Sequence, residues 1–543
     1  MAQLADEILA ALDQEQRAVA TAVRGPVCVI AGAGTGKTRA ITHRLAYAVD
    51  IGIVEANRIL ALTFTARAAG EMRARLRALG VPAIAARTFH AAALKQLLYF
   101  WPEALGGRFP ALLTSKSAFL GEALDRAGIA LTKSPAALRE ISSEIEWAKV
   151  LQIPSDEYVE AALANNRVIT SRSKLNLEDI ARTYESYESL KRQERVIDFE
   201  DVLLLTVGML EEVKEIRDRV RDQYRYFTVD EYQDVSPLQQ RLLDLWLGKR
   251  SDICVVGDPA QTIYSFAGAT PAFLLNFTKR FPDAEVIRLS AGYRSTPEII
   301  NIANAILRSG ELGHDLEAVN SHGNQPATSG FKSESEEINS IVDSLRLKIE
   351  SGTKPHEIAV LARTNAQLED LEKALFGAGI ENQIRTAERF FERSDVRAMI
   401  SAIRSASVLA TSDWLSELRD LLKQFGDGDK YARAIIQLAQ ELANEGIDSM
   451  RAFLRELEDR AEQNNPPDLP GVTLATLHGA KGLEWEYVYL VGASSRYLPW
   501  PGSSTEEERR LFYVGVTRAK RELNLSYAGE ASPFIASAGL SGN

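Results

Sequence analysis

The feature that most constrains the fold is a glycine-rich octapeptide, Ala31-Gly32-Ala33-Gly34-Thr35-Gly36-Lys37-Thr38. It follows a short apolar run, residues 27–30 (VCVI), which predicts a buried strand. It precedes an amphipathic pattern (RAITHRLAYAV), which predicts a helix. Glycines at such a junction let backbone N–H groups and the helix N-terminus cradle phosphate groups. The strict pattern has glycine where Ala31 stands, so the octapeptide predicts a variant phosphate-binding loop in an α/β domain.

A second segment supplies the carboxylates that a nucleotide site needs. Residues 226–230 (YFTVD) predict a strand that ends in Asp230, and Glu231 follows directly. A carboxylate in this position can hold Mg²⁺, and its neighbour can polarise the attacking water. Together with the glycine-rich loop, this pair predicts an ATPase that uses ATP and Mg²⁺, with Thr38 and Asp230 as the metal-binding residues.

Strand-like and helical patterns alternate in two regions of the 543-residue chain. In the first region, the predicted strands are at 27–30, 58–64, 226–230 and 253–258, with a helix over 67–79. In the second region, they are at 284–289, 357–363, 472–477, 487–492 and 523–528. Such alternation is typical of parallel sheets covered by helices. The expected fold class is therefore α/β, with two parallel-sheet domains.

Long helical patterns interrupt both regions. The first α/β domain is expected at 1–90 and 196–283, with a helical insertion at 91–195. The second is expected at 284–400 and 469–543, with a short helical insertion at 401–468 that ends in the polar linker QNNPPDLPG.

Composition limits the class of protein. Charged residues make up 25%, no apolar run is long enough to span a bilayer, and the acidic N-terminus lacks the basic region of a signal peptide. Cys28 and Cys254 lie in strand-like runs, which predicts buried free thiols rather than a disulfide or a structural metal. We expect a cytoplasmic protein without a membrane partner. The net charge of −11 argues mildly against nucleic acid, although net charge does not describe one particular groove.

Asp230-Glu231-Tyr232-Gln233-Asp234 resembles the DExQD box of the UvrD/Rep family of superfamily 1 helicases, and seven further segments resemble that family's motifs in order. They are LDQEQ (12–16), LALTFTARAAGEM (60–72), TFH (88–90), VVGDPAQTIYSFAGA (255–269), LSAGYRSTPEII (289–300), LATLHGAKGLEW (474–485) and RRLFYVGVTRAK (509–520). The matches cover most of the chain. The resemblance implies two RecA-like domains and an ATP-driven motor on nucleic acid.

The resemblance also implies the residues of the nucleotide site. The catalytic set is Lys37, Asp230, Glu231, Gln261, Arg294 and Arg518. Arg294 and Arg518 are expected to stabilise charge at the γ-phosphate, where a positioned arginine contributes about 10³–10⁵ in rate. The nucleotide-binding set is Gln16, Ala33, Gly34, Thr35, Gly36, Lys37, Thr38, Arg39, Tyr293 and Glu484, with Gln16 reading adenine, Tyr293 stacking on it and Glu484 at the ribose.

Sequence-tolerant binding of a single strand needs stacking rings and backbone contacts. The candidate rings are Phe64, Tyr264 and Phe266, and the candidate phosphate or sugar contacts are Thr65, Thr88, His90, Arg363 and His478. Two departures from the family weaken the expectation of efficient duplex opening. Phe266-Ala267 stands where relatives have Trp-Arg, and the second helical insertion, about seventy residues, is much shorter than theirs.

The resulting hypothesis is a 3′→5′ single-stranded DNA translocase and helicase acting at single-strand/double-strand junctions in DNA repair or recombination, associated with the nucleoid and possible repair proteins. The polarity, and DNA rather than RNA, follow from the resemblance alone. Three alternatives stay open: a translocase that strips proteins from single strands, an ATP-gated DNA-binding subunit of a larger complex, and a P-loop ATPase of another class. The complete catalytic set argues against the second, and the strand-contact motifs argue against the third.

Overall fold

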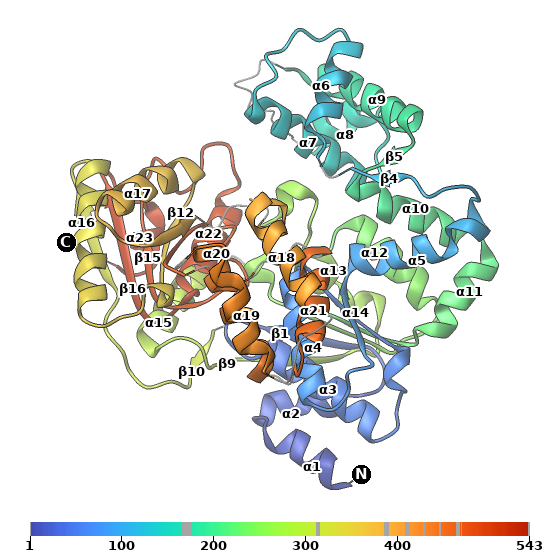
Figure 1. The fold of residues 1–543 in the computed structure, drawn as a ribbon, viewed down its shortest axis with the longest axis horizontal. Helices are drawn as coiled ribbons and strands as arrows, with labels where there is room; N and C mark the ends of the chain where they lie inside the picture. Colours follow the sequence, from blue (N-terminus) through green and yellow to red (C-terminus); the bar gives the residue numbers. More distant parts are fainter. Residues whose placement is uncertain are drawn as a thin grey trace. The chain divides into compact units, whose positions relative to one another are not determined.

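The computed structural model describes residues 2–113, 115–165, 167, 175–310, 315–384, 390–407, 413–426, 429–444, 447–462, 467 and 470–540. The chain forms two compact units (Figure 1). The first contains residues 1–30, 43–64 and 81–287, and the second contains residues 31–42, 65–80 and 288–543. The glycine-rich loop thus groups with the second unit, although it follows a strand of the first. None of the described helices is long and apolar enough to cross a membrane.

The first sheet has six strands in the order β3-β2-β6-β7-β1-β8. They are β1 (Val27–Ala31), β2 (Ile59–Thr63), β3 (Ala85–Thr88), β6 (Tyr226–Val229), β7 (Ile253–Gly257) and β8 (Glu285–Leu289). Neighbours from β3 to β1 pair in parallel, with Leu60 opposite Ala85 and Val29 opposite Val256. The central strands are buried along their whole length, which explains their continuous apolar sequences.

The second sheet also has six strands, in the order β11-β16-β15-β12-β14-β13. They are β11 (Ala327–Phe331), β12 (Ile358–Ala362), β13 (Asn382–Ile384), β14 (Val472–Thr476), β15 (Trp485–Leu490) and β16 (Ala519–Ala528). All five neighbouring pairs run parallel. The predicted α/β class with two parallel sheets is therefore confirmed.

The helices of the first region are α1 (Ala2–Ala10), α2 (Gln14–Thr21), α3 (Lys37–Asp50), α4 (Ala66–Ala78), α5 (Phe89–Ala104), α10 (Phe199–Glu212), α11 (Lys214–Gln223), α12 (Pro237–Leu247), α13 (Ala272–Leu275) and α14 (Phe277–Arg280). The first helical insertion contains α6 (Ser117–Arg126), α7 (Pro135–Val150), α8 (Tyr158–Ala164) and α9 (Leu177–Glu194). It is bounded by the short parallel strands β4 (Ala111–Leu112) and β5 (Val196–Ile197). Its core, centred on Ile141, Ile145 and Tyr187, is separate from the core of the sheet.

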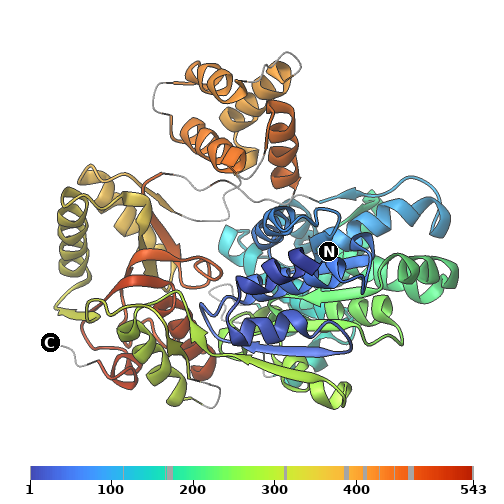
Figure 2. The same cartoon turned by 90° about the horizontal axis from the view of Figure 1, so that it is seen from below.

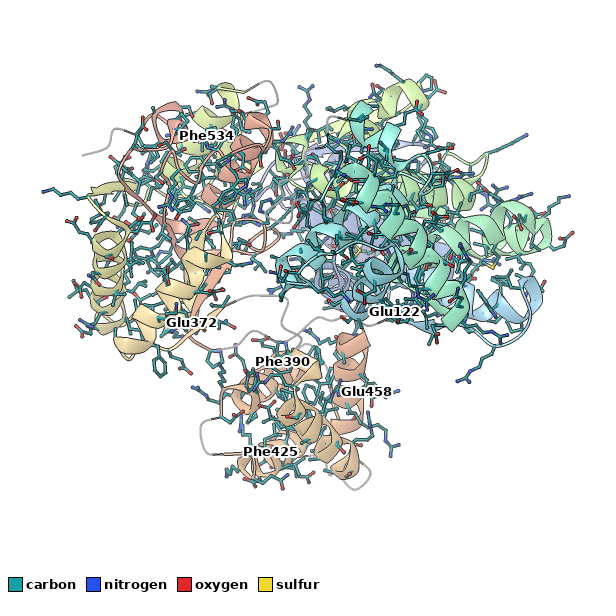
Figure 3. All side chains as sticks on the ribbon, turned by 90° about the horizontal axis from the view of Figure 1, so that it is seen from above. Glu122, Glu372, Phe390, Phe425, Glu458 and Phe534 are labelled. Carbon is teal, nitrogen blue, oxygen red and sulfur yellow. The ribbon has the colours of Figure 1, made fainter. Side chains whose placement is uncertain are left out.

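The helices of the second region are α15 (Pro297–Arg308), α16 (Glu334–Glu350), α17 (Asn365–Gly377), α22 (Thr505–Val516) and α23 (Pro533–Ser537), and β9 (Ala291–Gly292) pairs with β10 (Glu317–Ala318). Phe534 of α23, labelled in Figure 3, packs on Phe512 of α22 with the ring centroids 5.8 Å apart. The second helical insertion contains α18 (Ser394–Ala406), α19 (Trp414–Lys423), α20 (Lys430–Asn444) and α21 (Met450–Glu462), drawn in orange in Figure 2. Its own core runs from Phe390 to Leu457.

Two elements near the predicted boundaries pack with the first sheet. The strand at 284–289 was expected to open the second α/β region, but β8 is the edge strand of the first sheet, beside β1. The first helical insertion was expected to begin at residue 91, but α5 packs in the core of the first sheet, where Leu97 and Phe100 join Leu60 and Phe227. In both cases long-range packing, which local periodicity does not report, decides where the segment belongs.

Both cysteines are buried and free, as predicted. They lie on the neighbouring strands β1 and β7, with Cys28 opposite Val255. Burial, and then the nearby Cys254, raise the pKa of the Cys28 thiol to about 12. Such a thiol stays protonated and unreactive at neutral pH.

Candidate functional site

Most of the predicted residues of the first region gather at one edge of its sheet. Strands β1, β2, β3, β6 and β7 run parallel, so their carboxyl ends lie along the same edge. Directly after these ends come the glycine-rich loop, Phe64-Thr65, His90, Asp230-Glu231 and the segment that leads to Gln261. Open α/β sheets bind ligands outside the carboxyl ends of their strands. This edge is therefore the candidate functional site of the first region.

The glycine-rich loop has the backbone of a phosphate-binding turn. Gly34 and Gly36 adopt φ values of +76° and +78°, which only glycine adopts without strain. The Thr35 hydroxyl donates to the Gly32 carbonyl at 3.0 Å and closes the turn. Lys37 is the first residue of α3, so Lys37 and the Thr38 hydroxyl lie where a helix N-terminus favours an anion. The loop fits the phosphates of ATP, and an oxygen ligand such as Thr38 fits Mg²⁺.

Within the second unit, the loop contacts residues that the sequence placed beside the nucleotide. The Tyr293 N–H donates to the Gly34 carbonyl at 2.9 Å. A Cβ atom on Gly34 would lie 2.6 Å from the Cβ of Arg294, so this position excludes any larger residue. The Ala33 N–H also faces the hydroxyl of Tyr513 at 3.5 Å. Tyr513 is fully buried in α22, and sequence reasoning missed it although it lies inside a quoted motif.

The acidic segment after β6 forms a network with the segment after β7. Glu231 has a left-handed backbone (φ +53°), and its N–H donates to Asp230 Oδ1 at 2.9 Å. The amide of Gln233 donates to Glu231 Oε2 at 2.5 Å, and its carbonyl accepts the Asp258 N–H at 3.0 Å. Asp258 Oδ2 in turn accepts from the Gln261 amide at 2.6 Å. Gln233, which the sequence analysis did not single out, therefore links the candidate water-polarising carboxylate to Gln261.

Gln16 lies in the first turn of α2, whose N-cap is Asp13. The Asp13 carboxylate accepts the Gln16 N–H at 2.7 Å, a standard cap that fixes the start of the helix. Gln16 is only 3% exposed. Arg39 lies in α3, two residues after Lys37.

Arg294, Glu484 and Arg518 lie together in the second unit. Glu484 and Arg518 immediately precede β15 and β16, so both are at the amino edge of the second sheet. Glu484 accepts from Arg294 at 2.6 Å and from Lys520 at 3.0 Å. Burial raises the pKa of Glu484, but these two cations outweigh burial and hold that pKa below its usual range. In this arrangement, the carboxylate predicted to take the ribose holds the guanidinium predicted to reach the γ-phosphate.

Arg518 is held firmly by its own unit. It is 1% exposed, and it donates to the carbonyls of Val514 and Leu483 at 2.8 and 3.1 Å and to the Thr517 hydroxyl at 3.0 Å. Arg294 donates to the neighbouring Thr517 carbonyl at 3.1 Å. Both guanidinium groups are thereby oriented in advance, which a group that stabilises transition-state charge requires.

The three rings predicted to stack on bases form a ladder within the first unit. Phe64 and Tyr264 are stacked at 5.3 Å with an interplanar angle of 18°, and Phe266 meets Tyr264 edge-on at 6.2 Å. Phe64 and Phe266 are 37% and 48% exposed, so two rings of the ladder leave apolar surface side by side for a ligand to cover. Arg167 donates to the Phe266 carbonyl at 3.1 Å, and its guanidinium also covers the Trp147 ring. The helical insertion thus supports the backbone beside Ala267, although it does not restore the missing cation there.

The polar residues predicted to contact the strand have structural roles as well. The hydroxyls of Thr65 and Thr88 accept the N–H of Ala68 and Ala91, each at 3.1 Å, and so cap α4 and α5. The ring of His90 stacks on Phe199 at 4.4 Å. Burial, and then the nearby Lys116, lower the pKa of His90 to about 4.

Phe199, at the start of α10, is another residue that was not among the predicted ones. It is 48% exposed, so its free face is available to a base. A phenylalanine at the first turn of a helix, directly after the capping residue Asp198, was the only signal in the sequence.

Arg363 and His478 lie at the carboxyl edge of the second sheet, after the neighbouring strands β12 and β14. Arg363 forms a two-bond ion pair with Glu508, at 3.0 and 2.7 Å, and its guanidinium lies 5.3 Å from the Trp500 ring centroid. Burial, and then Arg363 and Lys481, lower the pKa of His478 to about 4. Trp500, 36% exposed, was also not among the predicted residues.

Comparison with known proteins supports the same interpretation. The model of the UvrD/REP helicase N-terminal domain matches residues 12–282, and that of the UvrD-like helicase C-terminal domain matches residues 287–425 and 404–530. The chain is 44% identical over 571 residues to the ATP-dependent DNA helicase UvrD2 of Mycobacterium tuberculosis, covering 98% of this chain and 81% of that protein. It is 28% identical to the ATP-dependent DNA helicase PcrA of Leuconostoc citreum, over 95% of this chain and 82% of that protein. It is 27% identical to the putative ATP-dependent DNA helicase YjcD of Bacillus subtilis, over 95% of this chain and 78% of that protein. The chain therefore belongs to the UvrD/Rep family of superfamily 1 helicases.

Proposed function

We propose that the chain is an ATP-driven motor that moves 3′→5′ along single-stranded DNA and separates duplex at single-strand/double-strand junctions. The observation that carries this proposal is the first sheet, whose carboxyl edge is followed by the glycine-rich loop, by Asp230-Glu231 and by the exposed ladder of Phe64, Tyr264 and Phe266. One edge thus carries groups suited to phosphate and groups suited to bases. The names of the relatives support DNA as the substrate.

The nucleotide chemistry follows from the side chains. Lys37 and the N-terminus of α3 bind the phosphates, and Thr38 and Asp230 hold Mg²⁺, which when bound neutralises phosphate charge. Glu231 orients and polarises the attacking water, and Gln233 holds Glu231 in place. Gln261, Arg294 and Arg518 stabilise the charge that develops on the γ-phosphate. Gln16, Arg39, Tyr293 and Glu484 position the nucleoside.

The strand chemistry is sequence-tolerant. Every base has a face that stacks on a ring, and each stacked base contributes about 1–3 kcal/mol. Phe64, Tyr264, Phe266 and the added ring of Phe199 provide that surface in the first unit. Thr65, Thr88, His90, Arg363 and His478 supply the polar contacts; the two histidines act as neutral hydrogen-bonding groups because of their lowered pKa values.

A single-strand translocase that strips bound proteins is the second candidate. Two observations favour it: Ala267 lacks a charge beside the ring ladder, and the described residues of the second helical insertion form the helices α18–α21 around one core. A role in DNA repair or recombination in the cytoplasm, at the nucleoid and with repair proteins, fits either candidate.

The deciding experiment measures ATP hydrolysis with and without single-stranded DNA, and then unwinding of duplexes with a 3′ or a 5′ tail. The proposal predicts strong stimulation by single strands and unwinding that needs the 3′ tail, and it predicts that Lys37→Ala abolishes turnover. Absence of stimulation would sink the motor function. Stimulation without unwinding selects the stripping translocase, and a preference for the 5′ tail refutes the polarity.

A further inference from the structure

A cavity of about 70 Å³, partly open to solvent, lies in the second unit away from the candidate nucleotide residues. It is bounded by α16, by the N-terminal part of α17 and by the segment after β15. Its walls are Glu334, Glu337, Ile338, Ile341, Ala366, Gln367, Asp370, Leu371, Val491, Gly492, Ser494, Tyr497 and Ala528. Val491 directly follows the carboxyl end of β15, and Ala528 ends the adjacent strand β16. This is the part of an open α/β sheet where ligands bind.

The walls combine apolar surface with one sign of charge. Ile338, Ile341, Leu371 and Val491 supply the apolar surface, and the charged residues of the lining are the three acids Glu334, Glu337 and Asp370. No lysine, arginine or histidine belongs to the described lining. A cavity with this lining repels anions and favours a cation that also carries apolar atoms.

Glu337 is the acid best placed to select such a ligand. Glu337 lines the cavity, although only 4% of its surface is exposed. Its Oε1 accepts the Gly492 N–H at 2.8 Å and the Ser526 hydroxyl. Among the described residues, none donates a hydrogen bond to its Oε2. Burial raises the pKa of Glu337 more than these two hydrogen bonds lower it, so the carboxylate lacks a compensating charge.

The other two acids already have cationic neighbours. Glu334 accepts from Arg496 at 2.9 Å and from the Tyr497 hydroxyl at 3.0 Å, and Asp370 pairs with the exposed Lys373 at 3.2 Å. Neither acid is therefore expected to bind a cation in the cavity by itself. Gly492, also in the lining, has φ +66°, and a Cβ atom there would lie 2.1 Å from Gln367 Nε2, so this position favours glycine.

We propose that this cavity binds an organic cation, an ammonium or guanidinium head on an aliphatic stem, with the head on Glu337 Oε2. The stem packs on Ile338, Ile341, Leu371 and Val491. A buried carboxylate with one unused oxygen gains most from a charged donor, because charge-assisted hydrogen bonds are about twice as strong as neutral ones. The ligand is either a free small molecule or the arginine or lysine side chain of a partner.

The test is isothermal titration calorimetry on the full chain, without nucleotide or DNA, so that its outcome is independent of the proposed motor function. The probes are butylguanidine and its neutral isostere butylurea. We expect butylguanidine to bind at least tenfold more tightly than butylurea, and more tightly as pH rises, because binding favours the ionised carboxylate. Equal binding of the two probes, or binding of neither at millimolar concentration, overturns the proposal.

Variants assign the binding to the cavity. Glu337→Gln keeps the shape, removes the charge and is expected to weaken butylguanidine at least tenfold. Ala366→Phe adds a ring to the lining of the cavity while Glu337 stays, and it should weaken the binding of any probe that the cavity holds. Glu350→Gln, at the exposed end of the same helix, is the matched control and should bind as the natural chain does. Unchanged binding in a folded Ala366→Phe variant contradicts the site even if Glu337→Gln fails to fold.

A capped peptide Gly-Gly-Arg-Gly-Gly distinguishes the two sources of the cation. Binding as tight as that of butylguanidine supports a partner's side chain, and much weaker binding supports a free small molecule.

Discussion

Arg518 is predicted to stabilise charge at the γ-phosphate, and its surroundings suit that role. Three hydrogen bonds to its own unit hold the guanidinium, and the side chain is almost fully buried. A group fixed in this way loses little freedom when charge develops near it, so it acts on the transition state more than on the bound substrate.

Arg518→Ala is therefore expected to lower kcat by about 10³-fold or more, with a much smaller change in ATP affinity. Steady-state hydrolysis and nucleotide titration separate the two quantities. Arg521→Ala, three residues further along β16 and exposed, is the control and should keep kcat. Comparable losses of kcat and of affinity in Arg518→Ala would contradict a transition-state role.

His90 and His478 link the site to pH. Both have a pKa of about 4 in the folded chain, well below the ordinary value of 6.5. Between these two values the unfolded chain binds protons that the folded chain does not, so folding stability rises with pH across this window. The contribution of the two neutral histidines to folding stability is complete above pH 6.5 and is lost progressively as pH falls toward 4.

The thermal unfolding midpoint of the natural chain should accordingly fall between pH 7 and pH 5. In a His90→Gln, His478→Gln double variant, part of that fall should disappear. His356→Gln, at an exposed position, serves as the control. An unchanged pH profile in the double variant would show that these two histidines do not cause the fall of the unfolding midpoint.

At the level of elements, a buried ionic cluster joins α7, α9 and α10. Lys149 Nζ lies 2.7 Å from Asp198 and 3.2 Å from Glu188, and Lys191 Nζ lies 2.9 Å from Asp198. The carboxylates of Glu188, Asp198 and Asp201 have the spacing of a metal site, but the two ammonium groups occupy the position that a cation would take. The cluster also includes the Asp198–Asp201 capping box that starts α10.

Lys149→Met should lower the free energy of unfolding by about 3–5 kcal/mol, because it leaves buried carboxylates without one of their cations. Urea unfolding followed by circular dichroism measures the loss. Lys133→Met removes an exposed pair with Asp125 and should cost less than about 1 kcal/mol. Equal effects of the two substitutions would show that burial does not matter at this cluster.

The sequence predicted the buried strands well and the edge strands poorly. Strands β1, β2, β6, β7, β12 and β14 are continuous apolar runs, because parallel strands are buried on both faces. β3 (AART), β11 (ATSGF) and β13 (NQI) were missed because each lies at a sheet edge and has short or polar side chains. β8 was found but assigned to the wrong sheet, since strand pairing is decided by partners far away in the sequence.

The residues of the candidate site also divide into those that the sequence identified and those that it missed. Motif residues such as Lys37, Asp230 and Arg518 were identified because fixed spacings carry them, although their roles stay predictions. Phe199 and Trp500 were missed because exposure identifies them, and an exposed ring has no local pattern that separates it from a buried one. Gln233 was quoted in a motif, but its bridging role depends on the approach of β6 to β7.

Across the whole molecule, the second sheet separates two kinds of candidate residue. Glu484 and Arg518 precede β15 and β16 at its amino edge, whereas Arg363 and His478 follow β12 and β14 at its carboxyl edge. Trp500, beside Arg363, belongs with the second group. If ATP acts at one edge and the strand at the other, the five-residue and six-residue strands between them form the mechanical connection.

This separation predicts that a change at the carboxyl edge alters the response to DNA and leaves the basal ATPase intact. Trp500→Ala is the suitable variant, because Trp500 is partly exposed and its loss leaves the buried Arg363–Glu508 pair in place. The loss of one stacked base, about 1–3 kcal/mol, should raise the DNA concentration for half-maximal stimulation by roughly 5- to 150-fold. Trp500→Phe should restore most of the response, since a ring remains, and Phe376→Ala, at a far more exposed ring on α17, should change nothing. If Trp500→Ala lowered basal hydrolysis as much as DNA-stimulated hydrolysis, the two edges would not be functionally separate, and the sheet could not be the connection between them.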